Sequence, residues 1–263
     1  MTSRISRPDR VLELPKALIL DFGGVIVASS KPAGWQDVVA DRITALAGAG
    51  RVPSRDRVIA DVVAGAQAAG QWRNAMSRPL RPVELAQEAF VMDFIAADWS
   101  DSQRAAIASH TAAISYCVAS AKEHRELRPG IRELLGFCHL REIPVVIVSN
   151  ALSGQVHRDF LAAQQLSDAF AAELYSDEVG IRKPNPDFML MGCKAVVRAP
   201  ADCWYVGDHL DRDVLCGIRA GIGCNVLLPS PHAAGHPQVF GVSADIVRED
   251  PAALLETMKG IET

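Results

Sequence analysis

The sequence has 263 residues, of which 49% are hydrophobic and 22% charged, as in a folded globular chain rather than a disordered one. Its 27 basic and 31 acidic side chains give a net charge of -4 and are scattered, which argues against nucleic acid as a partner. No stretch approaches the roughly 20 apolar residues of a membrane span, and the polar N-terminus lacks a signal-peptide core, so the sequence predicts a cytoplasmic protein with no membrane partner.

Residues 1–13 are predicted to be a mobile leader, and the first regular segment follows over residues 16–27. An apolar run reaches Asp21, two glycines follow, and a second β-branched run leads into a predicted polar turn at 28–32. Unbroken apolar character is typical of a strand buried on both faces of a parallel sheet. Asp21 is then expected at the carboxyl end of that strand, where open α/β sheets bind ligands. An ordinary turn beginning at Asp21 is the alternative.

Residues 35–126 differ in character, since they are rich in Ala, Arg, Gln and Glu and carry apolar residues at helical spacing. Helices are expected over 82–97, with Pro82 in the first turn, and over 102–118. No convincing strand is present, so the region is predicted to be an all-helical insertion large enough to form a domain. The apolar residues at helical spacing are Val38, Val39, Ile43, Leu46, Val58, Val62 and Val63.

Strand and helix patterns alternate from Leu127 to the end of the chain, which predicts an α/β fold with a doubly wound parallel sheet. The predicted domains are therefore an α/β core of residues 1–32 and 125–263 and a helical domain of residues 33–124. Strands are expected at 143–148, 172–175, 203–206 and 224–228, helices at 128–140, 155–165, 187–197, 213–220 and 251–258, and loops at 176–186 and 229–237.

Polar residues follow several of these predicted strands, and the carboxyl ends of parallel strands lie at one edge of a sheet. A carboxylate nucleophile, a hydroxyl donor, a lysine and a carboxylate cluster for a hard cation are the groups that phosphoryl transfer requires. Each group has a simpler reading: a turn or helix cap, a solvated lysine, or acids near a helix N-terminus. The residues are Asp21, Ser149, Asn150, Lys183, Asp208, Asp211 and Asp213.

The order of these motifs resembles the haloacid dehalogenase-like hydrolase superfamily. The matching segments are 21–25, 148–150, 183–186 and 206–213, and each motif is specific only in combination with the others. The resemblance covers residues 14–32 and 125–263 as a Rossmann-like core. It also implies that the helical insertion is a cap domain, as in the capped members of the superfamily.

The resemblance implies a nucleophile and a metal site. Asp21 is expected to attack phosphorus and to form an aspartyl-phosphate. A Mg²⁺ cofactor is expected to be held by Asp21, Asp208 and the backbone carbonyl of Gly23, where it neutralises charge on the transferred group. Asp213, and with less support Asp211, is expected to assist the metal or the motif lysine.

The resemblance also implies a site for the phosphoryl group. Ser149 and Asn150 are expected to bind the substrate, with the Ser149 hydroxyl donating to a phosphoryl oxygen. Lys183 is expected to supply positive charge beside that group and to act in catalysis. Its charge is also expected to keep Asp21 and Asp208 ionised.

One residue departs from the pattern of the superfamily's phosphatases. These usually carry a second Asp two residues after the nucleophile as general acid/base, and this chain has Gly23 there. A general acid/base typically accelerates a reaction about 10²–10⁴-fold, and Gly23 cannot supply one. The substrate can instead have a good leaving group, such as a sugar anomeric phosphate or an acyl phosphate. Alternatively His209 or His124 acts in its place, or the chain is a weak enzyme.

The predicted function is a Mg²⁺-dependent phosphatase acting on a small phosphorylated metabolite, with a sugar phosphate as one candidate, in a monomer or homodimer. A 2-haloacid dehalogenase is the first alternative, because such members also lack the second Asp and carry Ser-Asn; they need no metal. A catalytically silent protein that binds a phospholigand is the second. The residues that determine substrate specificity are expected in the cap. Residues 71–74 form a polar-aromatic cluster there, which is either a solvated helix face or a contact for a sugar or a second anion.

Overall fold

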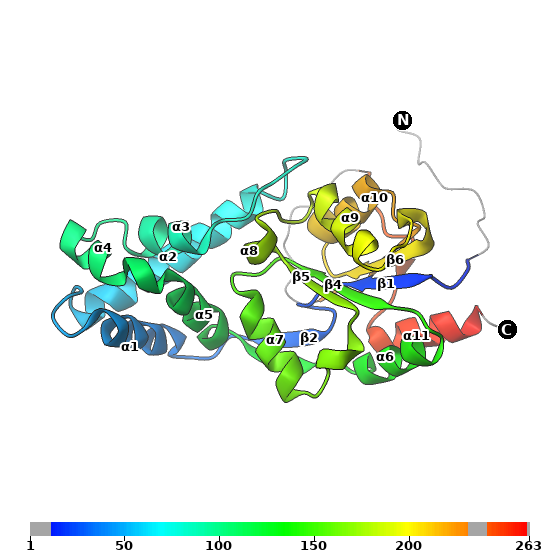
Figure 1. Ribbon diagram of the computed structural model, residues 1–263, viewed down its shortest axis with the longest axis horizontal. Helices are drawn as coiled ribbons and strands as arrows, with labels where there is room; N and C mark the ends of the chain where they lie inside the picture. Colours follow the sequence, from blue (N-terminus) through cyan, green and yellow to red (C-terminus); the bar gives the residue numbers. More distant parts are fainter. Residues whose placement is uncertain (1–11, 231–240, 262–263) are drawn as a thin grey trace.

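The computed structural model describes residues 12–230 and 241–261. The predicted leader at 1–13 and the predicted loop at 229–237 therefore lie mostly outside the described residues. Figure 1 shows a central sheet with helices on both of its faces and a group of helices, α1 to α5, gathered at one end of the molecule.

The sheet has six strands in the order β5-β4-β1-β6-β7-β8, and every neighbouring pair is parallel. This order confirms the predicted doubly wound α/β fold and places β1 beside both β4 and β6. The described strands are β1 (Ala17–Leu20), β2 (Val27–Ser30), β3 (His124–Leu127), β4 (Val145–Ser149), β5 (Ala172–Tyr175), β6 (Cys203–Gly207), β7 (Cys224–Leu227) and β8 (Ile246–Val247).

The helices of the helical insertion precede those of the core along the chain. Two segments, Phe90–Ile95 and Leu210–Val214, are π-helical, the second leading directly into α10. The described α-helices are α1 (Trp35–Ala47), α2 (Arg55–Ala75), α3 (Gln87–Ala89), α4 (Asp101–Ile107), α5 (Thr111–Ala121), α6 (Ile131–Leu140), α7 (Gly154–Ala163), α8 (Ser176–Val179), α9 (Pro186–Ala195), α10 (Leu215–Ala220) and α11 (Pro251–Gly260).

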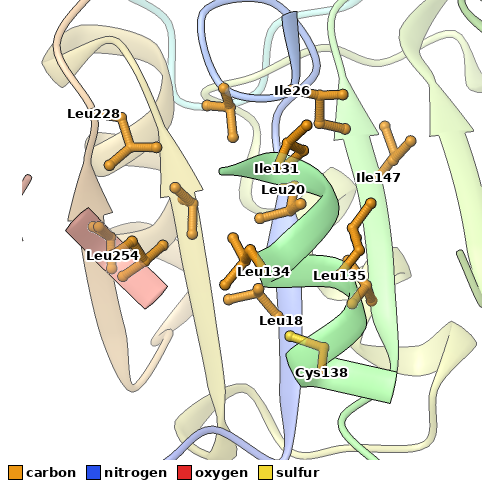
Figure 2. Packing of buried hydrophobic residues seen from close by; sticks show 14 of the residues in the cluster. Leu18, Leu20, Ile26, Ile131, Leu134, Leu135, Cys138, Ile147, Leu228 and Leu254 are labelled. Carbon is orange, nitrogen blue, oxygen red and sulfur yellow. The ribbon is translucent and has the colours of Figure 1, made fainter. Parts of the chain in front are cut away.

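Strand β1 is buried on both faces because successive side chains point to opposite sides of the sheet. Leu18 and Leu20 belong to the cluster that packs against α6 and α11, where Figure 2 shows them facing Leu134. Ile19 belongs to the cluster on the other face, together with Phe188 of α9. An unbroken apolar strand is therefore what this double covering requires, as the sequence predicts.

A separate hydrophobic cluster fills the helical insertion, with buried members from Trp35 to Val118. Val39 and Ile43 lie in it, whereas Val38 and Val63 are 56% and 41% exposed although they share the apolar pattern. We refer to residues 33–124 as the cap; its boundaries stay a prediction.

Strands β2 and β3 correct the expectations of a turn at 28–32 and of no strand within residues 35–126. They pair antiparallel, with Val27 opposite Leu127 and Ser30 opposite His124. The two chain crossings between core and cap therefore lie side by side. Val27 and Leu127 at one end of the pair contact the core cluster, but the other paired residues are small or polar and mostly partly or fully exposed. The pairing therefore depends on this tertiary contact and is not evident from an apolar pattern in the sequence.

A strap of non-helical chain, residues 76–86, joins α2 to α3, and its second half lies against the core. The backbone of Val83 forms an antiparallel bridge with Ile181, and the Pro82 carbonyl accepts a hydrogen bond from the Arg182 amide at 3.4 Å. The prediction of a helix from Pro82 is therefore wrong for its first residues. This stretch satisfies its backbone on the core instead of turning into a helix.

Two other predicted segments also differ from the structure. The predicted loop at 176–186 begins with the single-turn helix α8. Strand β8, which follows the residues left out of the description, has no counterpart among the predicted strands. Within residues 12–230 and 241–261, no helix combines the length and the apolar character needed to cross a membrane.

Glu84 fixes the strap to the core through buried polar contacts. Its Oε1 lies 2.9 Å from Nη1 of Arg182, and the two side chains are only 3% and 1% exposed. Its Oε2 accepts a hydrogen bond from the Ser176 hydroxyl at 2.6 Å. Burial lowers the pKa of Arg182 to about 10, and the Glu84 carboxylate opposes that effect. The Glu84 carboxylate therefore stabilises the buried Arg182 cation.

Glu84→Gln is expected to lower the free energy of unfolding by about 3–5 kcal/mol, because Arg182 would keep a buried charge without a carboxylate. The measurement is denaturant unfolding of the purified variant. Glu256→Gln is the matched control, since Glu256 pairs with Lys259 at 2.8 Å with both side chains at least half exposed; it should cost at most about 1 kcal/mol. Equal small losses in both variants would contradict the importance of the Glu84 contact.

Candidate active site

The three central strands of the sheet bring the predicted site residues to one edge. Asp21 directly follows β1, Ser149 is the last residue of β4, and Asp208 directly follows β6. Because β4, β1 and β6 are adjacent and parallel, their carboxyl ends point the same way. All three side chains are buried and line one cavity.

Lys183 lies at the centre of this group. Its Nζ is 2.9 Å from Oδ1 of Asp21 and 2.6 Å from Oδ1 of Asp213, and its side chain is 1% exposed. It also donates a hydrogen bond to the Tyr205 hydroxyl at 2.8 Å. A lysine with two carboxylates and a phenol around it is held in one position, so the simpler reading of Lys183 as a solvated loop residue is wrong.

Asp213 is bonded through both of its carboxylate oxygens. Oδ1 accepts hydrogen bonds from Lys183 and, at 2.7 Å, from the Tyr205 hydroxyl, while Oδ2 accepts from the backbone amides of Asp208 at 3.1 Å and His209 at 2.9 Å. Asp213 therefore holds both the lysine and the turn after β6. Sequence reasoning missed Tyr205, which sits within an apolar strand and gives no motif of its own.

Asn150 bonds to the backbone of Lys183 in both directions. Its Oδ1 accepts from the Lys183 amide at 2.8 Å, and its Nδ2 donates to the Lys183 carbonyl at 3.2 Å. The side chain therefore ties the end of β4 to the loop that carries Lys183. Its predicted contact with substrate stays a prediction.

Asp208 faces the turn that follows Asp21. A Cβ added to Gly24 would lie 2.1 Å from Oδ2 of Asp208, and Gly24 has a φ of +71°, so only glycine fits there. The Asp208 carboxylate also accepts a hydrogen bond from Ser230 and contacts Nδ1 of His209.

Gly23 has no such steric reason, since a Cβ built on it meets no atom within 4 Å among the described residues. The space that a second carboxylate would occupy is open. Of the two histidines considered as replacements, His209 lines the cavity. His124 does not line it and instead forms an exposed contact with Glu126, 3.4 Å apart.

Burial and charge act against one another on the ionisable groups. Burial raises the pKa of Asp21 above its ordinary value, and the Lys183 ammonium offsets only part of that effect. Burial also disfavours the charged form of Asp213, but there Lys183 prevails and lowers the pKa. Burial opposes the Lys183 ammonium, yet Asp21 and Asp213 raise its pKa. Lys183 therefore favours the ionised form of both Asp21 and Asp213, and burial opposes it at each.

The charges present favour a divalent cation. Three buried carboxylates, those of Asp21, Asp208 and Asp213, line the same cavity as the buried Lys183 ammonium, which contacts Asp21 and Asp213. Carboxylate and carbonyl oxygens are the ligands that Mg²⁺ prefers. Among the described residues, Asp208, His209 and Asp213 offer ligand atoms that all lie within 4.8 Å of one another, close enough to share one ion. The predicted ligand set of Asp21, Gly23, Asp208 and Asp213 stays a prediction. Asp211 is buried nearby in the chain but does not line the cavity.

The cavity lies between core and cap and measures about 450 Å³. This volume is within the range of about 300–1,000 Å³ found for small-molecule sites. A larger cavity of about 690 Å³ is lined by residues of α1, α5 and α7 and contains none of the predicted site residues. Chemistry rather than volume therefore identifies the smaller cavity as the candidate active site.

Comparisons with known proteins identify the family of this chain. A family model described as haloacid dehalogenase-like hydrolase matches residues 15–221. Phosphoserine phosphatase from Thermus thermophilus is 32% identical over 98 residues, which cover 36% of this chain and 39% of that protein. Glyceraldehyde 3-phosphate phosphatase from Methanopyrus kandleri is 36% identical over 53 residues, 20% of this chain and 23% of that protein. The chain thus matches about a quarter to two fifths of the length of these relatives.

Among solved structures, CbbY from Rhodobacter sphaeroides in complex with phosphate is similar, with a TM-score of 0.60 and 15% identity over 92% of this chain and 96% of that chain. At this identity the likeness shows the fold. The family model matches well over half of the chain, in the segments that carry the strand-end residues. The chain therefore belongs to the haloacid dehalogenase-like hydrolase family.

Proposed function

We propose that this chain is a Mg²⁺-dependent phosphatase that hydrolyses a small phosphorylated metabolite through an aspartyl-phosphate on Asp21. The observation that carries the proposal is the buried contact between Lys183 Nζ and Asp21 Oδ1 at the edge of the cavity. The phosphatase names of the curated relatives support the same reaction class.

The hydrogen bonds of Asp21 favour one of its oxygens as the nucleophile. Oδ1 accepts from Lys183 and, at 2.7 Å, from the Phe22 amide, whereas no donor among the described residues meets Oδ2. In the proposed first step Oδ2 bonds to phosphorus as the bond from phosphorus to the leaving oxygen breaks. In the second, water attacks phosphorus, phosphate departs and the Asp21 carboxylate is restored.

The remaining residues bind and orient the phosphoryl group in this proposal. Ser149 donates its hydroxyl to a phosphoryl oxygen, and Lys183 stabilises the charge that develops there. Asn150 and Asp213 keep Lys183 in position. A Mg²⁺ ion held by Asp21, Asp208 and the Gly23 carbonyl would supply electrostatic stabilisation of the same charge.

No side chain at Gly23 can protonate the leaving oxygen. The proposal therefore favours substrates whose leaving group needs little assistance, such as a sugar anomeric phosphate or an acyl phosphate. A 2-haloacid fits the site less well, because its carboxylate would lie near the buried carboxylates of Asp208 and Asp213.

The test is a release assay on a panel of phosphate esters, acyl phosphates and 2-haloacids, with Mg²⁺ and with EDTA. We expect phosphate release that falls about 10²-fold or more in EDTA and returns when Mg²⁺ is added. Halide release that survives EDTA would instead identify a dehalogenase. Binding of inorganic phosphate without turnover on any substrate would identify a silent phospholigand-binding protein.

A further inference from the structure

The part of the candidate cavity that lies away from Asp21 is strongly positive. Apart from the cluster around Lys183, the cavity is lined by six cationic side chains and by two carboxylates, Glu84 and Glu123. Glu84 is bonded to Arg182, and Glu123 to Arg125. The six cationic side chains are those of Lys31, Arg73, Lys122, Arg125, Arg182 and Arg212.

Arg73 is the most constrained of the remaining cations. It lies near the end of α2, and its guanidinium is 5.5 Å from the centroid of the Phe90 ring. Its Nη2 is buried and has no hydrogen-bond partner among the described residues, and its Nε is 3.8 Å from the nearest oxygen of Glu84. A buried guanidinium nitrogen without an acceptor is costly unless a ligand supplies one.

Lys122 faces the same region from the end of α5. Its Nζ lies 5.8 Å from the centroid of the Trp35 ring, with Lys31 at 5.5 Å from that ring, and no carboxylate of the described residues is within ion-pair distance of it. Burial lowers the pKa of Lys122, and the charge of Arg73 lowers it further. Arg73 and Lys122 line the same cavity, so an anion bound there would be attracted by both cations and would offset their mutual repulsion.

These positions decide between the two readings of residues 71–74. Gln71 and Asn74 are exposed, as on a solvated helix face, but Arg73 is partly buried and lines the cavity. The cap thus directs a cation toward the ligand rather than toward solvent.

We propose that the substrate carries a second anionic group, a carboxylate or a phosphate, that binds between Arg73 and Lys122. The inference rests on the proposed function, because the first anionic group is the phosphoryl group at Asp21. The proposed substrate is therefore a phosphorylated carboxylic acid or a bisphosphate. Arg73 presents a fork of N–H donors suited to either group, and Lys122 adds a point charge.

The experiment measures equilibrium binding in Mg²⁺ to Asp21→Asn protein, which is not expected to turn the ligands over. The probes are inorganic phosphate and three compounds that differ only at their second end: propane-1,3-diol monophosphate, 3-phosphooxypropanoate and propane-1,3-diol bisphosphate. Arg73→Met and Lys122→Met are combined in turn with Asp21→Asn. Arg78→Met is the matched control, since Arg78 is an exposed cap arginine outside the cavity.

We expect at least one of the two probes that carry a second anionic group to bind about 10- to 100-fold more tightly than the monophosphate. Arg73→Met and Lys122→Met should each remove most of that gain, and Arg78→Met should keep it. Inorganic phosphate should bind all variants alike, which also shows that they are folded. The relative affinities of the carboxylate and phosphate probes identify the second group.

Two results would overturn the inference while leaving the proposed function intact. In one, inorganic phosphate binds, but neither 3-phosphooxypropanoate nor propane-1,3-diol bisphosphate binds more tightly than the monophosphate. In the other, the gain survives both Arg73→Met and Lys122→Met. Failure of the proposed function has a different signature, because the protein with Asp21 intact would then release phosphate from no ester, whatever the relative affinities of the probes.

Discussion

Asp21→Asn is expected to abolish phosphate release, with kcat lowered by roughly 10⁴-fold or more, because an amide cannot form the aspartyl-phosphate. The loss should appear on every substrate that the parent protein hydrolyses. The assay is phosphate release under saturating substrate and Mg²⁺. Wild-type turnover in this variant would show that another group attacks phosphorus.

The same substitution should leave the fold intact. Burial already disfavours the Asp21 carboxylate, and Lys183 keeps its contact with Asp213 at 2.6 Å, so no buried charge loses its only partner. We expect the free energy of unfolding to change by about 1 kcal/mol or less. Asp202→Asn is the matched control, since Asp202 is also paired with a lysine, Lys16 at 3.2 Å, but is 38% exposed. It should leave both turnover and stability unchanged.

The fold could be predicted from the sequence wherever burial imposes a pattern. Strand β1 is apolar throughout because both of its faces are covered, and β4 and β6 show the same unbroken character. Strands β2 and β3 were not predictable in this way. Their residues are mostly partly or fully exposed and satisfy no hydrophobic period, and only the return of the chain from the cap pairs them.

The conformation of the strap also could not be predicted from local sequence. Pro82 at the start of an apolar and acidic run is a normal helix signal. The segment remains extended because its backbone bonds to the loop of Arg182 and because Glu84 enters a buried contact with that residue. Such long-range pairing leaves no trace in local sequence.

Some residues of the candidate site could likewise be predicted from the sequence, and others could not. Asp21, Ser149 and Asp208 were predictable because each follows a strand, and strand ends of a parallel sheet share an edge. Tyr205 was not, since it lies inside a strand and belongs to no motif. Arg73 falls within the polar-aromatic cluster at 71–74, but the sequence left open whether that cluster is a solvated helix face or a ligand contact. The positions of both side chains depend on which face each element turns toward the cavity.

Unlike Asp21→Asn, Lys183→Met is expected to lower the free energy of unfolding as well as the activity. Without the ammonium, the carboxylates of Asp21 and Asp213 would face each other in a buried site with no cation. Removing one partner from such a buried cluster costs about 3–5 kcal/mol of unfolding free energy. At this chain length that loss corresponds to a melting temperature lower by roughly 10 °C.

Activity should fall by about 10²–10³-fold or more in the fraction that remains folded, because the phosphoryl group loses a preorganised cation. The measurements are thermal unfolding in EDTA, where no metal replaces the missing charge, and phosphate release in Mg²⁺ at a temperature below the transition. Lys16→Met is the matched control: it breaks an ion pair that is 65% and 38% exposed, and it should cost about 1 kcal/mol or less. If Lys183→Met melted within about 2 °C of the parent, the ammonium could not be what holds the two buried carboxylates together, and the electrostatic account of the site would fail with it.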